Sequence, residues 1–176
     1  MKRIAVVYYS FSGNTRRVAE FIKEYLNKEG YWVELIEIKP LKEPRNFFAR
    51  CKSAFRREIV ELVAGEKYDL SDYECVIFGS PVWSFNIPSA LRSYLNIAKG
   101  LKHKKTGFFL TCGIAALAEI AFDDVRKILV DKGADIILAE IILGRRTADK
   151  EYLEEVFFKY FEFFPLVLSG KRAPLA

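Results

Sequence analysis

The stretch "YYSFSGNTRRVAEF", residues 8–21, joins an apolar run to an amphipathic one through a short polar turn. The apolar run before the turn, "RIAVVYY" at residues 3–9, has the β-branched and aromatic content of a buried strand. After the turn, apolar residues recur at helical spacing as far as Leu26, and Gly30 marks the end of a predicted helix over residues 15–28. The stretch therefore predicts a strand–turn–helix unit.

The turn has the composition of an anion-binding site. The start of a helix offers unpaired N–H groups and a partial positive charge, and Gly13 lets a ligand approach the backbone closely. Ser10, Ser12, Asn14 and Thr15 add side chains that can form hydrogen bonds. Ordinary helix capping is the alternative, but four polar residues around one glycine favour an anion site. We expect the two following arginines on a solvated helix face.

The rest of the chain repeats the alternation of strand and helix. We predict further strands over residues 31–38, 73–80, 105–113 and 134–143. Helices are predicted over residues 45–64, 88–98, 114–132 and 148–164; Gly133 caps the third of these and Pro165 stops the last. Nearly continuous apolar strands are typical of a parallel sheet covered by helices on both faces. The sequence thus predicts one α/β domain over residues 1–176.

The predicted helix over residues 45–64 is basic. Its apolar stripe consists of Phe47, Phe48, Cys51, Phe55, Ile59, Leu62 and Val63, and its cations are Arg45, Arg50, Lys52, Arg56 and Arg57. Residues 39–67 carry eight Lys or Arg against four Glu, which accounts for most of the net charge of +5. We expect the stripe to pack on the body with the cations in water; contact with an acidic partner or a cofactor edge is the alternative.

Composition excludes several classes of protein. The charge is confined to one segment and no nucleic-acid-reading motif is present, so we expect no nucleic acid partner. No apolar run is long enough to span a bilayer. Cys51, Cys75 and Cys112 lack the spacing of a disulfide framework or a zinc site, which favours a reducing cytoplasm. Charged residues make up 29% of the chain and glutamine is absent, a bias found in thermophile proteins.

Known phosphate and hydrolase motifs are also missing. The chain contains no GxxxxGK[ST], GxGxxG or GxSxG, and its one histidine, His103, lies in a lysine-rich turn. In an open parallel sheet, ligands bind beyond the carboxyl ends of the strands. The informative loops are therefore residues 10–15 after the first strand, 80–86 after the third and 111–113 after the fourth.

Three segments resemble the flavodoxin family. "SFSGNT" is similar to the family's S/T-x-S/T-G-N-T phosphate loop. "VIFGSPVWSFNIPSALRSYL" resembles its third strand, flavin loop and following helix, and "FFLTCG" resembles its fourth strand and last flavin loop. The resemblance covers nearly the whole chain. It implies a flavodoxin-like three-layer α/β sandwich with a five-stranded parallel sheet in the order 2-1-3-4-5, and a non-covalently bound FMN.

The resemblance also implies which residues hold FMN. The first loop, with Ser10, Phe11, Ser12, Gly13, Asn14 and Thr15, would bind the 5′-phosphate. The second loop, with Pro81, Val82, Trp83, Ser84, Phe85 and Asn86, would pass along the isoalloxazine ring, with Trp83 as the expected stacking residue. Thr111, Cys112 and Gly113 would line the pyrimidine side or the ribityl chain. We expect Cys112 to be a small loop residue, with a redox thiol as the alternative.

The chain departs from electron-shuttle flavodoxins because it is basic, whereas they are strongly acidic. None of the three loops contains a carboxylate, so less like-charge repulsion opposes the reduced flavin anion, and we expect a less negative reduction potential. The first hypothesis is an FMN protein that carries electrons between a reductase and an acceptor. The second is an NAD(P)H-dependent FMN or quinone reductase, and the third a non-redox partner-binding module. The aromatic-rich last helix allows a homodimer.

Overall fold

The computed structural model of the chain describes residues 2–42, 46–63, 67–162 and 164–168. Five parallel strands form one sheet in the order β2-β1-β3-β4-β5. The strands are β1 (Arg3–Tyr8), β2 (Trp32–Glu37), β3 (Cys75–Pro81), β4 (Lys105–Cys112) and β5 (Asp135–Leu143). The helices are α1 (Asn14–Lys28), α2 (Phe47–Phe55), α3 (Ser89–Ile97), α4 (Glu119–Asp131), α5 (Lys150–Phe161) and α6 (Phe164–Leu168). Two 3₁₀ turns are η1 (Ala115–Leu117) and η2 (Gly144–Arg146).

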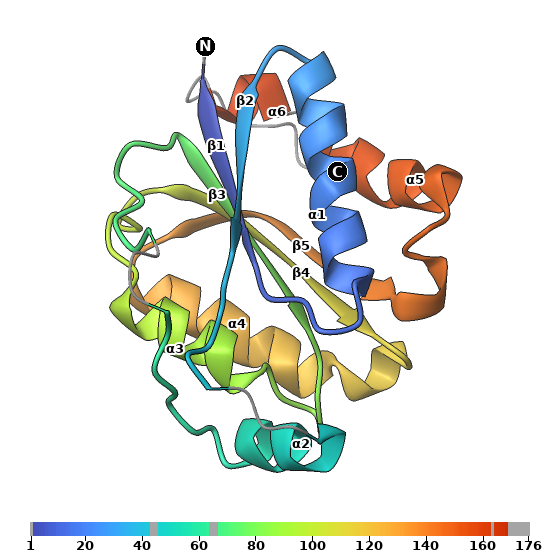
Figure 1. Cartoon of the computed structure of the whole chain (residues 1–176). Coiled ribbons are helices and arrows are strands. Elements are labelled where there is room, and N and C mark those ends of the chain that lie inside the picture. The colour runs from blue at the N-terminus through green and yellow to red at the C-terminus, as the bar shows by residue number, and fades with distance from the viewer. Residues whose placement is uncertain (1, 43–45, 64–66, 163, 169–176) are drawn as a thin grey trace.

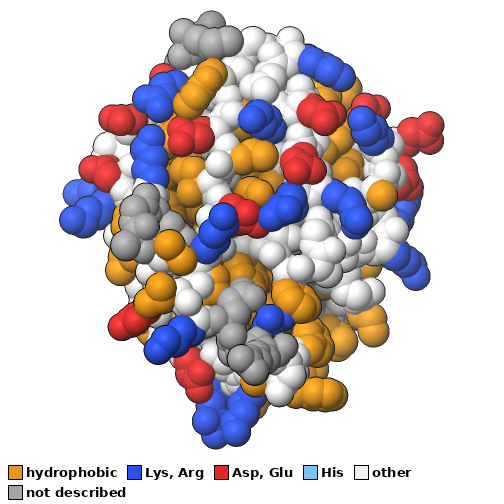
Figure 2. All heavy atoms as spheres, viewed as in Figure 1, with side chains coloured by type: hydrophobic (Ala, Val, Ile, Leu, Met, Phe, Trp, Pro, Cys, Tyr) orange, Lys and Arg blue, Asp and Glu red, His pale blue; other side chains and the backbone are white. Residues whose placement is uncertain are grey.

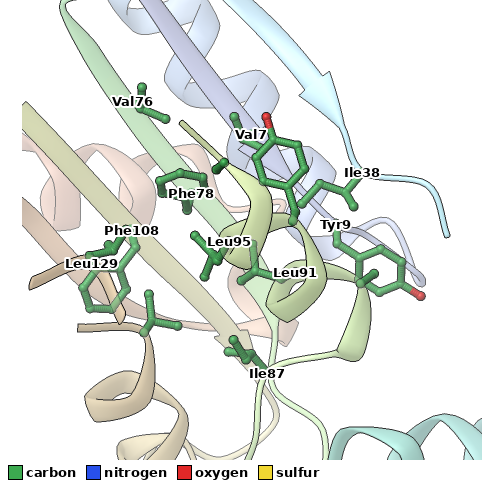
Figure 3. Close-up of a cluster of buried hydrophobic side chains, with 14 of the residues drawn as sticks. Val7, Tyr9, Ile38, Val76, Phe78, Ile87, Leu91, Leu95, Phe108 and Leu129 are labelled. Atoms are coloured by element: carbon green, nitrogen blue, oxygen red, sulfur yellow. The ribbon is translucent and has the colours of Figure 1, made fainter. Parts of the chain in front are cut away.

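Helices cover both faces of the sheet, as the apolar strands predict. Helices α1, α5 and α6 lie on one face and α3 and α4 on the other, while α2 lies beyond the carboxyl edge (Figure 1). Alternate residues of β1 divide between the two cores: Ala5 and Val7 join one, and Ile4 and Val6 join the other. Figure 3 shows the first core, where Val7, Val76, Phe78 and Phe108 of the strands meet Leu91, Leu95 and Leu129 of α3 and α4.

The central strands end together at the carboxyl edge. Tyr8 of β1 is paired with Gly79 of β3, and Pro81 of β3 with Thr111 of β4. Gly79 has no room for a side chain, because an added Cβ would lie 2.3 Å from the Phe109 ring. The parallel pairing of these strands brings the three loops that are predicted to bind a ligand to one edge of the sheet.

The prediction of a helix over residues 45–64 is wrong in its length and in its orientation. Helix α2 ends at Phe55, since Arg57 adopts a left-handed φ of 55° and the chain then turns. The later residues are extended: Leu41 N donates to Glu61 O at 2.8 Å and Val63 N donates to Lys39 O at 2.9 Å. The tertiary pairing satisfies backbone groups that a longer helix would have used internally. Arg45 lies outside the described residues.

Two other predicted helices are divided. The helix expected over residues 114–132 is the 3₁₀ turn η1 followed by α4, because Ile114 is extended and the chain bends at Ala118. The helix expected over residues 148–164 is α5, capped by the Asp149 carboxylate, which accepts from Tyr152 N at 3.0 Å. Pro165 does not stop it; Pro165 lies in the first turn of α6, where its fixed φ suits a helix start. Gly133 follows α4 with a φ of 73°, as predicted for a cap.

The aromatic residues of the last helices are largely core. Phe157, Phe161 and Phe164 are buried against α1 and the sheet, whereas Phe158 points into solvent. None of the helices in the described part of the chain is both long enough and apolar enough to span a bilayer.

Candidate functional site

The first predicted loop forms an open cradle at the start of α1. Gly13 is the N-cap residue and has a φ of 87°, a conformation that side chains other than glycine rarely adopt. No side chain caps the helix there, and a Cβ built on Gly13 would meet nothing within 4 Å. Ser10 Oγ accepts from Arg16 N at 3.2 Å, which bends the loop back over the helix start. Apart from the Arg16 N–H, which Ser10 accepts, the helix start has no side-chain cap, and the space beside Gly13 is open, an arrangement that suits anions.

Thr15 and Thr111 join the first and third loops. Both side chains are buried, and their Oγ1 atoms lie 2.9 Å apart in a hydrogen bond. The Thr111 carbonyl also accepts from Val82 N at 2.9 Å, so the same residue holds the second loop. Thr111 thus connects the loops, whereas the resemblance placed it against the ligand.

Asn14 is held by a fourth loop, which the sequence reasoning missed. The buried Thr147 hydroxyl donates toward Asn14 Oδ1 at 3.2 Å and toward the Gly144 carbonyl at 3.0 Å. Arg17 Nη1 also donates to Asn14 Oδ1, at 3.0 Å. With its oxygen engaged, the Asn14 amide keeps its NH₂ group as the donor. The sequence did contain a signal for this loop, because Gly144 and Thr147 follow the fifth predicted strand, and the carboxyl ends of parallel strands lie at the same edge of the sheet.

The second loop is a tight turn under backbone strain. Trp83 and Asn86 exchange two backbone hydrogen bonds of 2.8 and 2.9 Å, and Ser84 and Phe85 both have positive φ, at 47° and 66°. Two positive φ values define a type I′ turn, which normally uses Asn or Gly. A bulky residue such as Phe85 at positive φ is an outlier, and such strain collects at functional sites.

The two aromatic residues of the second loop have different environments. The Trp83 ring is buried and meets Tyr9, Phe11 and Phe47 edge-on, at centroid distances of 5.6–6.0 Å. Phe85 is instead 45% exposed and lines a cavity. The strained turn therefore exposes Phe85 at the cavity, while Trp83 packs among the neighbouring aromatic rings.

A cavity of about 300 Å³ separates the second and third loops. It is lined by Val82, Ser84, Phe85, Cys112, Gly113, Ile114 and Leu117. A Cβ built on Gly113 would meet nothing within 4 Å, so the space beside this glycine is open. Ile114 and Leu117, which lie at the start of the helix predicted over residues 114–132, are exposed at the mouth. The lining of the cavity is therefore mostly apolar.

The titratable groups beside the site are few. Burial raises the pKa of the Cys112 thiol, although the Ile114 N–H opposes the shift, so Cys112 is protonated at neutral pH. Arg16 forms an ion pair with Glu37 of β2, away from the cradle. Burial, followed by the nearby Glu37 charge, raises the pKa of Tyr8 at the same corner. The cradle itself therefore offers neutral hydroxyl, amide and backbone donors, with the Arg17 guanidinium bound to Asn14 Oδ1 beside it.

One buried acceptor lacks a partner. Asn86 is 6% exposed and its Nδ2 donates to the Ser84 carbonyl at 2.9 Å, but its Oδ1 meets no donor among the described residues. Buried polar atoms in native proteins are nearly always paired, so this oxygen in the second loop is a candidate partner for a ligand N–H or an ordered water.

A family model described as NADPH-dependent FMN reductase matches residues 3–145 of the chain. The chain belongs to this family. The family identity agrees with the cradle and the cavity, and FMN is the cofactor of this flavodoxin-like protein. The residues fit that cofactor: a helix start without a side-chain cap at Gly13, with hydroxyls around it, suits a phosphate, and a mostly apolar cavity suits an aromatic ring.

Solved structures that resemble this chain include oxidoreductases and a flavodoxin. An NADH:FMN oxidoreductase superposes with a TM-score of 0.67 at 15% identity, over 97% of this chain and 92% of that one. The rubredoxin oxygen:oxidoreductase of Desulfovibrio gigas gives a TM-score of 0.64 at 21% identity, over 99% of this chain but 38% of that one. The two-electron-reduced flavodoxin of Megasphaera elsdenii gives a TM-score of 0.58 at 20% identity, over 89% of this chain and 98% of that one. These likenesses confirm the flavodoxin-like fold.

Proposed function

We propose that the loops at the carboxyl edge divide the binding of FMN between them. Ser10, Ser12, Gly13, Asn14 and Thr15 hold the 5′-phosphate through neutral donors and the start of α1. The strained Phe85 and the Cys112–Gly113 wall lie on either side of the ring. The remaining assigned residues shape the loops: Phe11, Pro81, Val82, Trp83, Ser84, Asn86 and Thr111.

We further propose that the protein is an NAD(P)H-dependent reductase. When bound, FMN supplies the chemistry by taking two electrons and one proton from NAD(P)H and later returning electrons to an acceptor. The observation that carries the proposal is the cavity bounded by Phe85, Ile114 and Leu117, whose apolar side chains are exposed at its mouth. A nicotinamide needs such an accessible apolar face to approach a flavin. The family match supports the same reaction.

The chain's own residues stabilise charge without acid or base groups. The three loops contain no carboxylate, so the nearest backbone N–H groups meet the reduced flavin anion without like-charge repulsion. The apolar walls of the cavity exclude water from the ring. Both features support a reduction potential that is less negative than that of an acidic carrier.

The test is anaerobic mixing of the yellow protein with NADPH and, separately, NADH. We expect the FMN absorbance near 450 nm, a general property of oxidised flavins, to bleach rapidly and stoichiometrically with at least one of them. A protein that stays yellow with both, yet reduces when a separate reductase is added, is the electron carrier instead. A colourless protein that refuses FMN would leave only a non-redox role.

Electron carriage is the second candidate because of helix α2. Three phenylalanines of α2 are exposed beside the first and second loops, a surface that an enzyme acting only on small molecules does not need. The two candidates are compatible, since a flavin reduced by NAD(P)H can pass electrons singly to a protein. The three free thiols support a reducing cytoplasm as the place of action.

A further inference from the structure

Helix α2 has its polarity inverted. Its buried residues are Arg50, Ser53 and Ala54, whereas Phe48 is 84% exposed and Phe55 is 67% exposed. Figure 2 shows apolar side chains at the lower right of the view, next to Lys or Arg side chains at the bottom, in the region where α2 lies in Figure 1. A solvated helix normally presents the opposite pattern, and exposed apolar patches of this kind mark interaction sites. We define the α2 face as Phe47, Phe48, Lys52, Phe55 and Arg56.

Polar contacts on the inner side hold α2 in this orientation. Ser53 Oγ and Ser89 Oγ form a buried hydrogen bond of 2.8 Å that joins α2 to the start of α3. The Arg50 guanidinium lies 3.8 Å from the centroid of the Phe11 ring, within the range of a cation–π contact. Asn46 Oδ1 caps the helix by accepting from Ala49 N at 2.7 Å. The phenylalanines therefore point outward because the helix is anchored, and a rotation that buried them would break these contacts.

The α2 face continues directly into the flavin loops. Phe47 meets the Trp83 ring at a centroid distance of 6.0 Å, and Phe11 of the first loop meets the same ring at 6.0 Å. Phe11 is itself 50% exposed. A protein seated on α2 would thus contact the loop that carries the FMN phosphate, through one continuous aromatic layer.

The charges on the face select the kind of partner. Lys52 and Arg56 lie next to the phenylalanines on the α2 face. Arg56 Nη1 lies 3.8 Å from Glu58 Oε1 in a loose ion pair, and more than half of the Arg56 side chain is exposed. The flavin loops add no carboxylate. Complementarity therefore calls for a partner with carboxylates around an apolar centre.

A second copy of the chain fits this face poorly. Lys52 lies between Phe48 and Phe55 in the exposed stripe. An antiparallel two-fold pairing centred on that stripe would bring the two Lys52 ammonium groups together at the axis, and like charges in an interface are costly.

We propose that the α2 face docks an acidic protein that accepts electrons one at a time from the bound FMN. The inference rests on the FMN chemistry proposed above, but not on which compound reduces the flavin. Two acceptor molecules each take one electron from the fully reduced flavin anion, which returns to oxidised FMN, and one proton passes to water. The face supplies apolar contact and positive charge next to the cofactor, which favours fast and reversible docking.

The test uses one haem acceptor in two charge states. The probes are cytochrome c, which is basic, and the same cytochrome c after its lysines are succinylated, which makes it acidic. The holoprotein is photoreduced anaerobically, without NAD(P)H, and mixed with each probe in a stopped-flow instrument. We expect the acidic probe to be reduced roughly tenfold faster at low salt, with a rate that falls as salt increases. Equal rates, or a faster reaction with the basic probe, would overturn the proposal.

Variants locate the effect on the face. Lys52→Glu should reverse the salt dependence, and Phe48→Ser should slow the acidic probe several-fold while leaving FMN content unchanged, because Phe48 is solvent-exposed. Lys28→Glu, at the far end of α1, makes the same charge change and should have no effect. If Lys28→Glu and Lys52→Glu act equally, the face is not the docking site.

Sedimentation and NADPH separate the other outcomes. A holoprotein dimer that Phe48→Ser converts to a monomer would assign the face to a second copy and contradict the proposal. If NADPH fails to bleach the flavin but the photoreduced protein still prefers the acidic probe, the reductase proposal fails and the docking proposal stands.

Discussion

The Ser10–Thr15 loop and helix α2 lie at the same edge of the sheet, but they use opposite kinds of residue placement. The loop points polar groups outward around a glycine in a left-handed conformation. Helix α2 buries an arginine and a serine and points phenylalanines outward. The difference teaches that each surface is shaped by what it meets: an anion in the first case and an apolar, acidic partner in the second. Four measurements can break or sharpen this comparison.

The largest expected effect compares a core phenylalanine with one on α2. Phe78→Ala should lower the free energy of unfolding by about 3–5 kcal/mol, because Phe78 is 1% exposed in the first core. Phe48→Ala should change it by less than about 0.5 kcal/mol. Urea unfolding of the apoproteins measures both. A large loss in Phe48→Ala would mean that Phe48 is buried in solution.

The next effect concerns the conformation of Gly13. Gly13→Ala should weaken FMN binding roughly tenfold or more. An alanine in the left-handed conformation costs about 1–2 kcal/mol, and a backbone shift that removes this strain would displace the N–H groups. Gly30→Ala is a matched control, with a φ of 84° and open space around it, but far from the site. Fluorescence titration of the apoproteins with FMN measures the affinities. Equal losses in the two variants would contradict the cradle.

A smaller effect is expected at the fourth loop. Thr147→Val keeps the side-chain shape but removes the hydroxyl that orients Asn14, and one such hydrogen bond is worth about 1 kcal/mol, or roughly fivefold in affinity. Thr147→Ser should restore FMN binding. Thr106→Val serves as the control, because Thr106 is also buried but lies at the start of β4, at the edge of the sheet opposite the loops. Isothermal titration with FMN checks the ranking, and an unchanged affinity in Thr147→Val would remove Thr147 from the site.

The smallest effect compares two thiols. Cys112 should react slowly with iodoacetamide at neutral pH, because burial raises its pKa and keeps it protonated, and its rate should increase with pH. Cys51 of α2 is less buried and should react first. Peptide mapping by mass spectrometry follows both. If Cys112 reacts faster than Cys51, the third loop is more open than described.

The five strands and the turn at Gly13 could be predicted because local signals specify them, whereas the strand order was implied only by the resemblance to the flavodoxin family. Apolar runs identify the five strands, and Gly13 among hydroxyls identifies the turn. The end of α2 could not be predicted correctly, because Ile59 and Leu62 continue the helical spacing of Phe48 and Phe55. Only the two phenylalanines belong to the helix. Periodicity reports an apolar face but not what covers it.

Tertiary contacts explain two features that the sequence did not reveal. Trp83, which the resemblance implies as the stacking residue, is enclosed by Tyr9, Phe11 and Phe47. The hydrogen bond between Thr147 and Asn14 joins residues 133 positions apart. No sequence window contains such a pair, so only the fold could reveal it.

The most direct measurement of the central claim is the difference in affinity between FMN and riboflavin for the apoprotein. The two ligands share the ring and the ribityl chain and differ only in the phosphate that the Ser10–Thr15 cradle is proposed to hold. We predict that FMN binds at least about a hundredfold more tightly, since a charge-assisted phosphate site makes several strong hydrogen bonds. Equal affinities for FMN and riboflavin would contradict the account.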